Sequence, residues 1–139
     1  MATHHTEITH REGLAFDAQL QDHNLRLDAD SSVGGQGYGP IPKPLMLTSL
    51  AGCTGMDVAS ILAKMQMPYA SFKVEVEGDL SEDHPKVYTA IRVRYLFTGD
   101  ALDRTKIEKA VELSQEKYCG VSAMLKQIAV LSYEIVLNP

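Results

Sequence analysis

The sequence predicts a single α+β domain over residues 1–139, in which strands and helices occupy separate stretches of the chain. Several stretches alternate between apolar and polar residues, as half-buried strands do. One long central stretch is apolar on nearly all sides, as in a buried helix. The expected order is strands, a long helix, strands, helices and a strand. This order differs from the strand–helix alternation of a wound parallel sheet.

Length and composition exclude several classes of protein. The 139 residues are 45% hydrophobic and 22% charged, which is typical of a folded domain and not of a disordered chain. The net charge of −5 lacks the basic surplus of nucleic-acid-binding proteins, so we expect no nucleic-acid partner. No apolar run approaches the ~18 residues of a membrane span, and the N-terminus lacks the pattern of a signal peptide. We therefore expect a cytoplasmic protein with no membrane partner.

The first third of the chain is predicted to form a hairpin followed by a loop. Residues 14–20 and 25–29 alternate in polarity, and Gln21-Asp22-His23-Asn24 supplies the turn between them. Residues 6–10 can add a short edge strand. Residues 31–44 hold four glycines and three prolines, so no regular element is expected there. A long loop in a compact domain is more often functional than decorative.

A long helix is predicted from Pro44, because proline is preset for the first helical position. Residues 45–65 are apolar on nearly all faces, and their charge is confined to Asp57 and Lys64. A domain of this size has little interior with which to cover such a helix. We therefore expect a second copy of the chain to cover it, which predicts a homodimer.

The second half of the chain predicts another hairpin, two helical stretches and a last strand. Residues 72–76 and 87–97 alternate in polarity around a turn at 81–86. Asp103 can cap a helix that runs to Tyr118 and is broken or bent at Gly120. A second apolar helical stretch follows over 121–129, and residues 131–137 close the chain as a strand.

The sequence contains two cysteines, Cys53 and Cys119, with no CxxC motif. Two thiols cannot make a four-thiolate zinc site, and a reducing cytosol disfavours a permanent disulfide. The N-terminal His4, His5 and His10 are expected on a frayed or exposed edge, so no metal site is predicted. The cysteines are therefore either two inert buried thiols or a pair that alternates between reduced and oxidised forms.

Both cysteines stand beside glycine. Gly52 and Gly55 flank Cys53, although each glycine in a helix costs about 0.5–1 kcal/mol relative to alanine. Small residues let a second backbone or a substrate approach, but they also fit a close helix crossing with an inert cysteine. Cys119 precedes Gly120. If a helix starts here, its backbone dipoles would stabilise a thiolate, whereas a core thiol at a helix junction fits equally well.

The presence of two such segments favours thiol redox chemistry. A peroxidatic cysteine attacks peroxide as a thiolate and becomes a sulfenic acid, which a second cysteine converts into a disulfide. The thiolate needs a neighbouring cation. The candidate cations are Lys43, Arg11, Arg92 and Arg94. Asp57, four residues after Cys53 on one helical face, would oppose ionisation of the thiol.

Nearly the whole chain resembles the OsmC/Ohr family. The resemblance lies in PKPLMLTSLAGCTGMDV (residues 42–58), EKYCGVSAML (116–125), EGLAFDA (12–18), HPKVY (84–88) and the glycine-rich loop. The AGCTGMDV form resembles a less characterised OsmC-like branch. The resemblance implies an α+β fold with antiparallel sheets around a long central helix, in an intertwined homodimer.

The resemblance also implies a function. It makes Cys53 the peroxidatic cysteine and Cys119 the resolving cysteine of an enzyme that reduces organic hydroperoxides at the dimer interface, in oxidative or osmotic stress defence. It implies no metal or organic cofactor, and a dithiol reductant such as protein-bound dihydrolipoamide. Lys43 stands where the family has a glutamate, and residues 31–44 contain no arginine to match the family arginine. Lys43 and Arg11 are the candidates for the activating charge.

Two other functions fit the same residues. In one, the dimer binds a small apolar ligand and the cysteines only line its pocket. In the other, the protein is a redox sensor whose Cys53–Cys119 disulfide changes partner binding without turnover.

Overall fold

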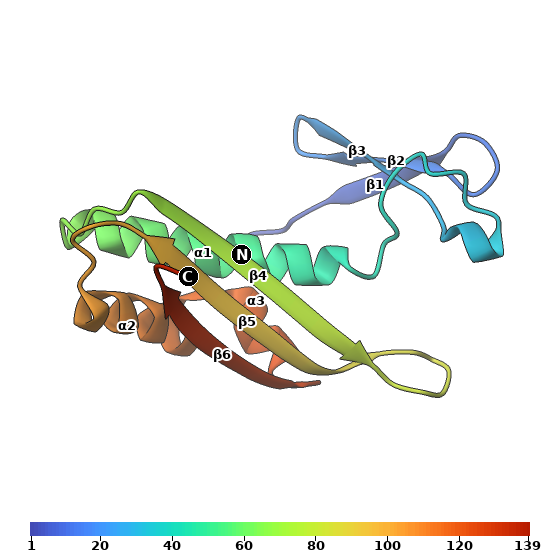
Figure 1. Cartoon of the computed structure of the whole chain (residues 1–139). Coiled ribbons are helices and arrows are strands. Elements are labelled where there is room, and N and C mark those ends of the chain that lie inside the picture. Colours follow the sequence, from blue (N-terminus) through green and yellow to red (C-terminus); the bar gives the residue numbers. More distant parts are fainter. The chain divides into compact units, whose positions relative to one another are not determined.

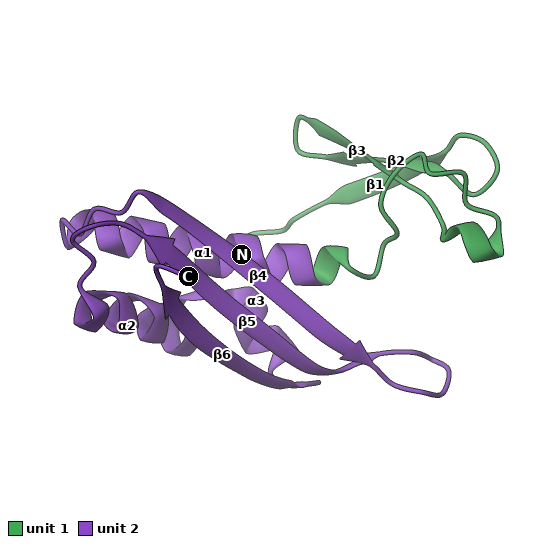
Figure 2. Ribbon diagram, in the orientation of Figure 1, with its two compact units in different colours: residues 1–46 green, residues 47–139 purple.

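The computed structural model describes all 139 residues and divides the chain into two compact units, residues 1–46 and residues 47–139 (Figure 2). We call them the N-terminal unit and the C-terminal unit. The predicted α+β class is confirmed, because two three-stranded sheets and three α-helices make up the chain (Figure 1).

The N-terminal unit is an antiparallel sheet in the order β1-β2-β3. Its strands are β1 (Thr6–His10), β2 (Phe16–Leu20) and β3 (His23–Leu27). The predicted four-residue turn is shorter in the structure, since Leu20 lies opposite His23 and only Gln21 and Asp22 connect them. Gln21 has a φ of 54°, and such positive φ values are typical of two-residue hairpin turns, whose twist matches that of the strands.

Residues 31–44 contain one short 3₁₀ helix, η1 (Ser31–Val33), although the sequence predicted no regular element there. The Asp30 side chain caps η1 by accepting a hydrogen bond from the Ser32 amide. The buried Asp28 carboxylate accepts hydrogen bonds from the backbone amides of Ala29, Gln36 and Tyr38. These bonds hold the loop against the end of β3, and they lower the pKa of Asp28, with Gln36 the largest contributor.

The C-terminal unit holds one mixed sheet, in the order β4-β5-β6, and most of the helices. The helices and strands after the loop are α1 (Leu45–Lys64), β4 (Ser71–Leu80), β5 (Tyr88–Thr98), α2 (Arg104–Leu113), the π-helix η2 (Ser114–Tyr118), α3 (Gly120–Leu125) and β6 (Val130–Leu137). β4 and β5 form the predicted antiparallel hairpin. β6 pairs with β5 in parallel, which corrects the expectation of antiparallel sheets. A helical crossover through α2, η2 and α3 returns the chain to the same end of the sheet, so the last strand runs parallel.

The core of the C-terminal unit lies between one face of this sheet and the helices. Alternate residues of β5 point into it, and Ile91, Val93, Tyr95 and Phe97 are fully buried. They meet a single stripe of α1 and one face of α2. The stripe consists of Leu50, Thr54, Val58 and Leu62, and the α2 residues are Ile107, Ala110 and Val111.

The predicted all-round burial of α1 is not seen within one chain. Only its one stripe is buried, and Met56 is 75% exposed. α1 is also long and apolar enough to cross a membrane by length and composition, which corrects the expectation that no segment meets that criterion. Core helices of soluble proteins commonly meet the same criterion. α1 is thus an apolar helix that is only partly covered by its own chain.

The predicted helix from Asp103 to Tyr118 is divided into α2 and the π-helix η2. Asp103 caps α2 as expected, by accepting a hydrogen bond from the Lys106 amide. The break comes at Cys119, whose backbone is extended, with φ −79° and ψ 101°. Gly120 begins α3. Single π-turns of this kind occur frequently at functional sites.

Candidate active site

The structure brings Cys53 and Cys119 together. Cys53 lies on α1, and Cys119 lies between η2 and α3. The two Sγ atoms and a carboxylate oxygen of Asp57 all lie within 4.8 Å of one another. Both thiols are free. Cys119 is only 3% exposed, whereas Cys53 is half-buried, so Cys53 is the more accessible sulfur.

Local helix geometry positions each of these groups. Cys53 and Asp57 are four residues apart on α1 and therefore share one face of it. Cys119 is the N-cap of α3, and its Sγ accepts a hydrogen bond of 3.3 Å from the Ser122 amide. The Cys119 amide donates to the Ser114 carbonyl oxygen at 2.8 Å. The end of the π-helix and the start of α3 therefore fix the second sulfur against α1.

The Cys119 thiol stays protonated at neutral pH. Burial raises the pKa of this thiol to about 11, and the hydrogen bond with Cys53 and the negative charge of Asp57 act in the same direction. The Ser122 amide lowers the pKa, but its effect is smaller than that of burial. The stabilisation of a thiolate that was expected from the start of α3 is thus smaller than the opposing effect of burial. Cys119 is therefore a poor nucleophile until its proton is removed.

A chain of hydrogen-bonded side chains connects Asp57 to Cys119 through the core. The chain runs Asp57–Ser114 (2.9 Å), Ser114–Thr54 (2.7 Å), Thr54–Tyr95 (2.7 Å), Tyr95–Gln115 (2.6 Å) and Gln115–Ser122 (2.7 Å), and the Ser122 amide then reaches Cys119 Sγ. No buried side-chain nitrogen or oxygen in the structure lacks a hydrogen-bond partner. Buried polar networks of this kind are stabilising when every member is satisfied.

The direction of the hydrogen bonds between Asp57 and Gln115 follows from an obligate acceptor, the Asp57 carboxylate, and an obligate donor, the Gln115 side-chain nitrogen. The Asp57 carboxylate can only accept, so the Ser114 hydroxyl gives it its single proton. Thr54 must then donate to Ser114, and Tyr95 must donate to Thr54. The Tyr95 oxygen then accepts the hydrogen bond that the Gln115 side-chain nitrogen donates. All the hydroxyl protons between Tyr95 and Asp57 therefore point toward the carboxylate.

Sequence reasoning missed the members of this hydrogen-bonded chain that lie between Asp57 and Cys119. Thr54 and Ser114 fall within apolar helical stripes, where a small hydroxyl gives no distinct signal. Tyr95 is fully buried among apolar residues of β5, and burial is the main cause that raises its pKa. Only the fold brings these residues together, because 41 positions separate Thr54 from Tyr95 and 60 separate Thr54 from Ser114.

A cavity of about 270 Å³ adjoins the thiol cluster. It is lined by Asp57, Ser60, Ile61, Lys64, Leu113 and Tyr118. Asp57 belongs both to this wall and to the group of atoms around the two sulfurs. The cavity therefore gives small molecules a route to the carboxylate beside the thiols, and Lys64 is the cation of its wall.

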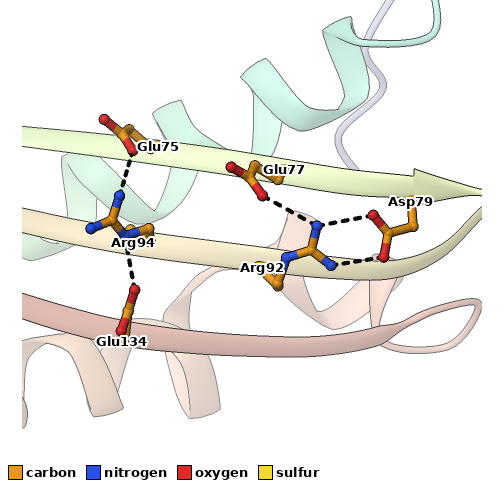
Figure 3. A network of polar contacts seen from close by, with 6 residues as sticks. All are labelled: Glu75, Glu77, Asp79, Arg92, Arg94 and Glu134. Carbon is orange, nitrogen blue, oxygen red and sulfur yellow. Dashed lines mark hydrogen bonds and ion pairs between the residues drawn. The ribbon is translucent and has the colours of Figure 1, made fainter.

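Arg92 and Arg94 do not face the thiols. They lie on β5 between core residues and point to the opposite face of the sheet, where they form ion pairs with neighbouring strands (Figure 3). The pairs are Arg92 with Glu77 and Asp79, and Arg94 with Glu75 and Glu134. This result removes both arginines as candidates for the activating charge.

Arg11 and Lys43 belong to the N-terminal unit, whereas the thiols belong to the C-terminal unit, so their role at the thiols stays a prediction. Arg11 Nε donates to Oδ2 of the buried Asp17, and Arg26 Nε donates to Oδ1 at 2.8 Å. The two guanidinium groups lower the pKa of Asp17, Arg26 more than Arg11. Lys43 lines a cavity of about 540 Å³ with Ala29, Asp30, Ile41, Pro42 and Met46.

Comparison with known proteins places the chain in a family. Residues 34–134 match the family described as OsmC-like protein. Protein YhfA of Escherichia coli K12 is 32% identical over 128 residues, which cover 90% of this chain and 92% of YhfA. A hypothetical protein of Aquifex aeolicus VF5, known from its crystal structure, is 29% identical and has a TM-score of 0.83 over 100% of both chains.

The fold also extends to more distant proteins. An organic hydroperoxide resistance protein OsmC of Legionella pneumophila is 16% identical and has a TM-score of 0.72, with 98% of each chain covered. The family match covers more than half of the chain, and YhfA resembles it over nearly its whole length. On this evidence the chain belongs to the OsmC-like protein family.

Proposed function

We propose that this protein is a thiol-dependent peroxidase that reduces organic hydroperoxides. The observation that carries the proposal is the approach of two cysteine sulfurs, from distant parts of the chain, to within 4.8 Å of each other. A disulfide requires this sulfur–sulfur separation to close to about 2.05 Å. One of the structures that share the fold is described as an organic hydroperoxide resistance protein, which supports the substrate class.

Cys53 is the attacking residue in this proposal, because it is the more exposed of the two sulfurs. Its thiolate attacks one peroxide oxygen, so that an S–O bond forms and the O–O bond breaks. The leaving alkoxide takes a proton and departs as an alcohol. Cys53 is then a sulfenic acid, and the peroxide has been reduced by two electrons.

Cys119 resolves this intermediate. Its sulfur attacks the Cys53 sulfenic sulfur, an S–S bond forms, and the hydroxyl group leaves as water after it takes a proton. The raised pKa of Cys119 keeps this sulfur protonated and unreactive toward peroxide until the sulfenic acid lies beside it. A dithiol reductant then exchanges with the disulfide and restores both thiols.

The charge that activates Cys53 is proposed to come from Lys43 or Arg11. The charged group near the two sulfurs in the C-terminal unit is the Asp57 carboxylate, which opposes ionisation of a thiol. In this proposal a cation from the N-terminal unit offsets that charge and lowers the thiol pKa. Arg11 is held in place by the buried Asp17, whereas Lys43 is a flexible point charge.

We also propose that residues 1–139 act as one domain in a cytoplasmic homodimer. Large apolar side chains are exposed on the single chain, and a second copy would cover them. Those of the C-terminal unit include Met56, Met124, Ile128 and Val130. A methyl group built on Gly52 of α1 would meet no atom within 4 Å, so this side of the helix is open to a partner.

A redox sensor is the second candidate function. The carboxylate beside the thiols and the high pKa of Cys119 favour slow turnover, which suits a protein that signals by forming a disulfide once. A sensor would oxidise rapidly with hydroperoxide but would show no sustained cycling with any dithiol. Steady-state peroxide consumption therefore separates the two functions.

The first test is to count thiols after the reduced protein meets one equivalent of cumene hydroperoxide. We expect the native chain to lose both thiols to an internal disulfide, Cys53→Ser to keep its remaining thiol, and Cys119→Ser to stop at a sulfenic acid. Circular dichroism verifies that each variant is folded. Survival of both thiols at the rate of free cysteine would exclude the peroxidase and the sensor, and would favour a ligand-binding module.

A further inference from the structure

The three groups at the thiol site have the geometry of a cation site. Cys53 Sγ, Cys119 Sγ and an Asp57 oxygen form a triangle with no side longer than 4.8 Å. An ion at the centre of an equilateral triangle of that size lies about 2.8 Å from each corner, compared with bonds of about 2.3 Å from Zn²⁺ to sulfur and 2.0–2.2 Å to carboxylate oxygen. Small side-chain rotations would therefore bring all three atoms to bonding distance.

We propose that the reduced Cys53, Cys119 and Asp57 side chains together bind one thiophilic divalent cation of the Zn²⁺ class. Cys53 and Asp57 supply two ligands from one face of α1, and Cys119 supplies the third from the start of α3. The ion covers both sulfurs and blocks their reaction with peroxide. It acts as a reversible inhibitor of the thiol pair and takes no part in turnover.

The chemistry of the donors selects the class of cation. Thiolates are soft ligands that favour Zn²⁺ over Mg²⁺ or Ca²⁺, which bind oxygen. Bound thiols lose their protons to solvent, so two thiolates and one carboxylate surround the ion. The dication neutralises two of these three negative charges. It thereby offsets the repulsion between these negative charges and the free-energy cost of burying a thiolate at Cys119.

The surroundings of Asp57 prepare it to act as a ligand. The Ser114 hydroxyl donates to Oδ2 at 2.9 Å, which orients the carboxylate. Hydrogen bonds from outer residues commonly orient metal ligands in this way. The cavity of about 270 Å³ reaches Asp57 and provides an entry path, as well as space for a water molecule as the fourth ligand.

Metal binding and oxidation exclude each other. Once the ion has dissociated, a hydroperoxide converts the two thiols to a disulfide and is itself reduced to an alcohol and water. The disulfide sulfurs are poor ligands, so the cation does not bind again until the disulfide is reduced. Binding itself needs only the reduced thiols and no peroxide, and it is therefore independent of the proposed peroxidase activity.

The test is a titration of the metal-free, reduced, untagged protein with Zn²⁺ under anaerobic conditions. We expect one ion per chain, and loss of this binding in the Cys53→Ser and Cys119→Ser variants. Asp57→Asn should weaken affinity by about tenfold or more, which is at least the effect of disturbing an outer shell. Asp100→Asn removes an equal charge from an exposed loop and should leave affinity unchanged. All variants keep His4, His5 and His10, so binding by these residues is subtracted.

Two further measurements use the native protein and therefore do not depend on whether a variant folds. Co²⁺ should give sulfur-to-metal charge-transfer absorption, which histidine and carboxylate ligands do not produce. Zn²⁺ should protect both thiols from alkylation, and protein previously oxidised with diamide should bind no ion. Absence of charge-transfer absorption and of protection would overturn the site. Equal Zn²⁺ affinities for Asp57→Asn and the native chain would overturn the three-ligand cluster.

Discussion

The Ser114 hydroxyl donates a 2.9 Å hydrogen bond to Asp57 Oδ2, and this bond fixes the direction of the hydrogen bonds that the Thr54 and Tyr95 hydroxyls make. The bond connects the first residue of the π-helix to the middle of α1. Each hydroxyl has one proton, so donation by Ser114 to Asp57 makes Thr54 the donor to Ser114 and Tyr95 the donor to Thr54. The carboxylate beside the thiols is thus held by the core of the C-terminal unit, and not only by its own helix.

Breaking the hydrogen-bonded chain at Tyr95 is expected to destabilise the protein. Tyr95→Phe leaves the Gln115 amide without its acceptor and Thr54 without its donor, both in the core. A buried unsatisfied group costs about 1–3 kcal/mol, so the free energy of unfolding in urea should fall by that amount. Tyr133→Phe is the matched control. It removes a hydroxyl from a side chain that is 42% exposed, and it should change stability by less than about 0.5 kcal/mol.

The hydrogen-bonded side chains should also contribute to stability cooperatively. Ser114→Ala removes the donor to Asp57 and the acceptor of Thr54, and its effect should not add to that of Tyr95→Phe. We expect the double variant to lose less stability than the sum of the two single losses, because the second change removes partners that the first has already disturbed. Additive losses in a double-mutant cycle would show that the two hydroxyls stabilise the fold separately.

Asp57 is expected to suppress the ionisation of Cys119. Its negative charge contributes to raising the pKa of this thiol, as does the hydrogen bond with Cys53. In a Cys53→Ser background, where Cys119 is the only thiol, Asp57→Asn should lower the pKa of Cys119. The pH dependence of iodoacetamide alkylation measures this pKa. An unchanged alkylation profile would mean that burial alone keeps the thiol protonated.

The stability of the reduced protein should fall between about pH 9 and pH 11. Folding raises the pKa of Cys119 to about 11, so in this range the folded chain holds a proton that the unfolded chain has released. The stabilisation is complete below the pKa of the unfolded thiol and is lost as pH rises toward 11. Two pKa units correspond to roughly 2–3 kcal/mol.

The contribution of Cys119 is isolated by subtracting the unfolding free energy of the Cys119→Ser variant from that of the native protein at each pH. Tyr88, Tyr95 and Tyr133 also have raised pKa values and lose protons at high pH, but both proteins contain them. We therefore expect the stability difference between the two proteins to shrink from pH 8 to pH 11. A constant difference over this range would contradict the raised pKa of Cys119.

The sequence was informative where a signal is local and uninformative where only topology decides. Period-2 and helical patterns predicted the strands, α1 and the cap at Asp103, because those patterns reflect one buried face. The π-helix from Ser114 was missed, since residues 107–118 keep apolar residues at ordinary helical spacing. The parallel pairing of β6 was missed as well, because strand direction depends on the crossover before it.

The candidate site was predictable in part for the same reason. Cys53 and Cys119 were predicted to act together because each stands beside a glycine in a distinctive segment. The position of Asp57 four residues after Cys53 correctly indicated a negative charge on the same helix face. Arg92 and Arg94 were wrong candidates for the activating charge. Strand alternation places them on the face opposite Val93 and Tyr95, and their acidic partners lie on neighbouring strands.

Gly52 gives a direct test of the proposed homodimer. Within one chain, a methyl group at this position meets nothing within 4 Å, so Gly52→Ala should stabilise an isolated α1 by about 0.5–1 kcal/mol. If a partner helix packs closely on this face, the same methyl group will instead obstruct it. We expect Gly52→Ala to raise the dissociation constant of the dimer in analytical ultracentrifugation, while circular dichroism stays unchanged. A more stable Gly52→Ala protein with unchanged self-association would show that no partner packs against this face of α1.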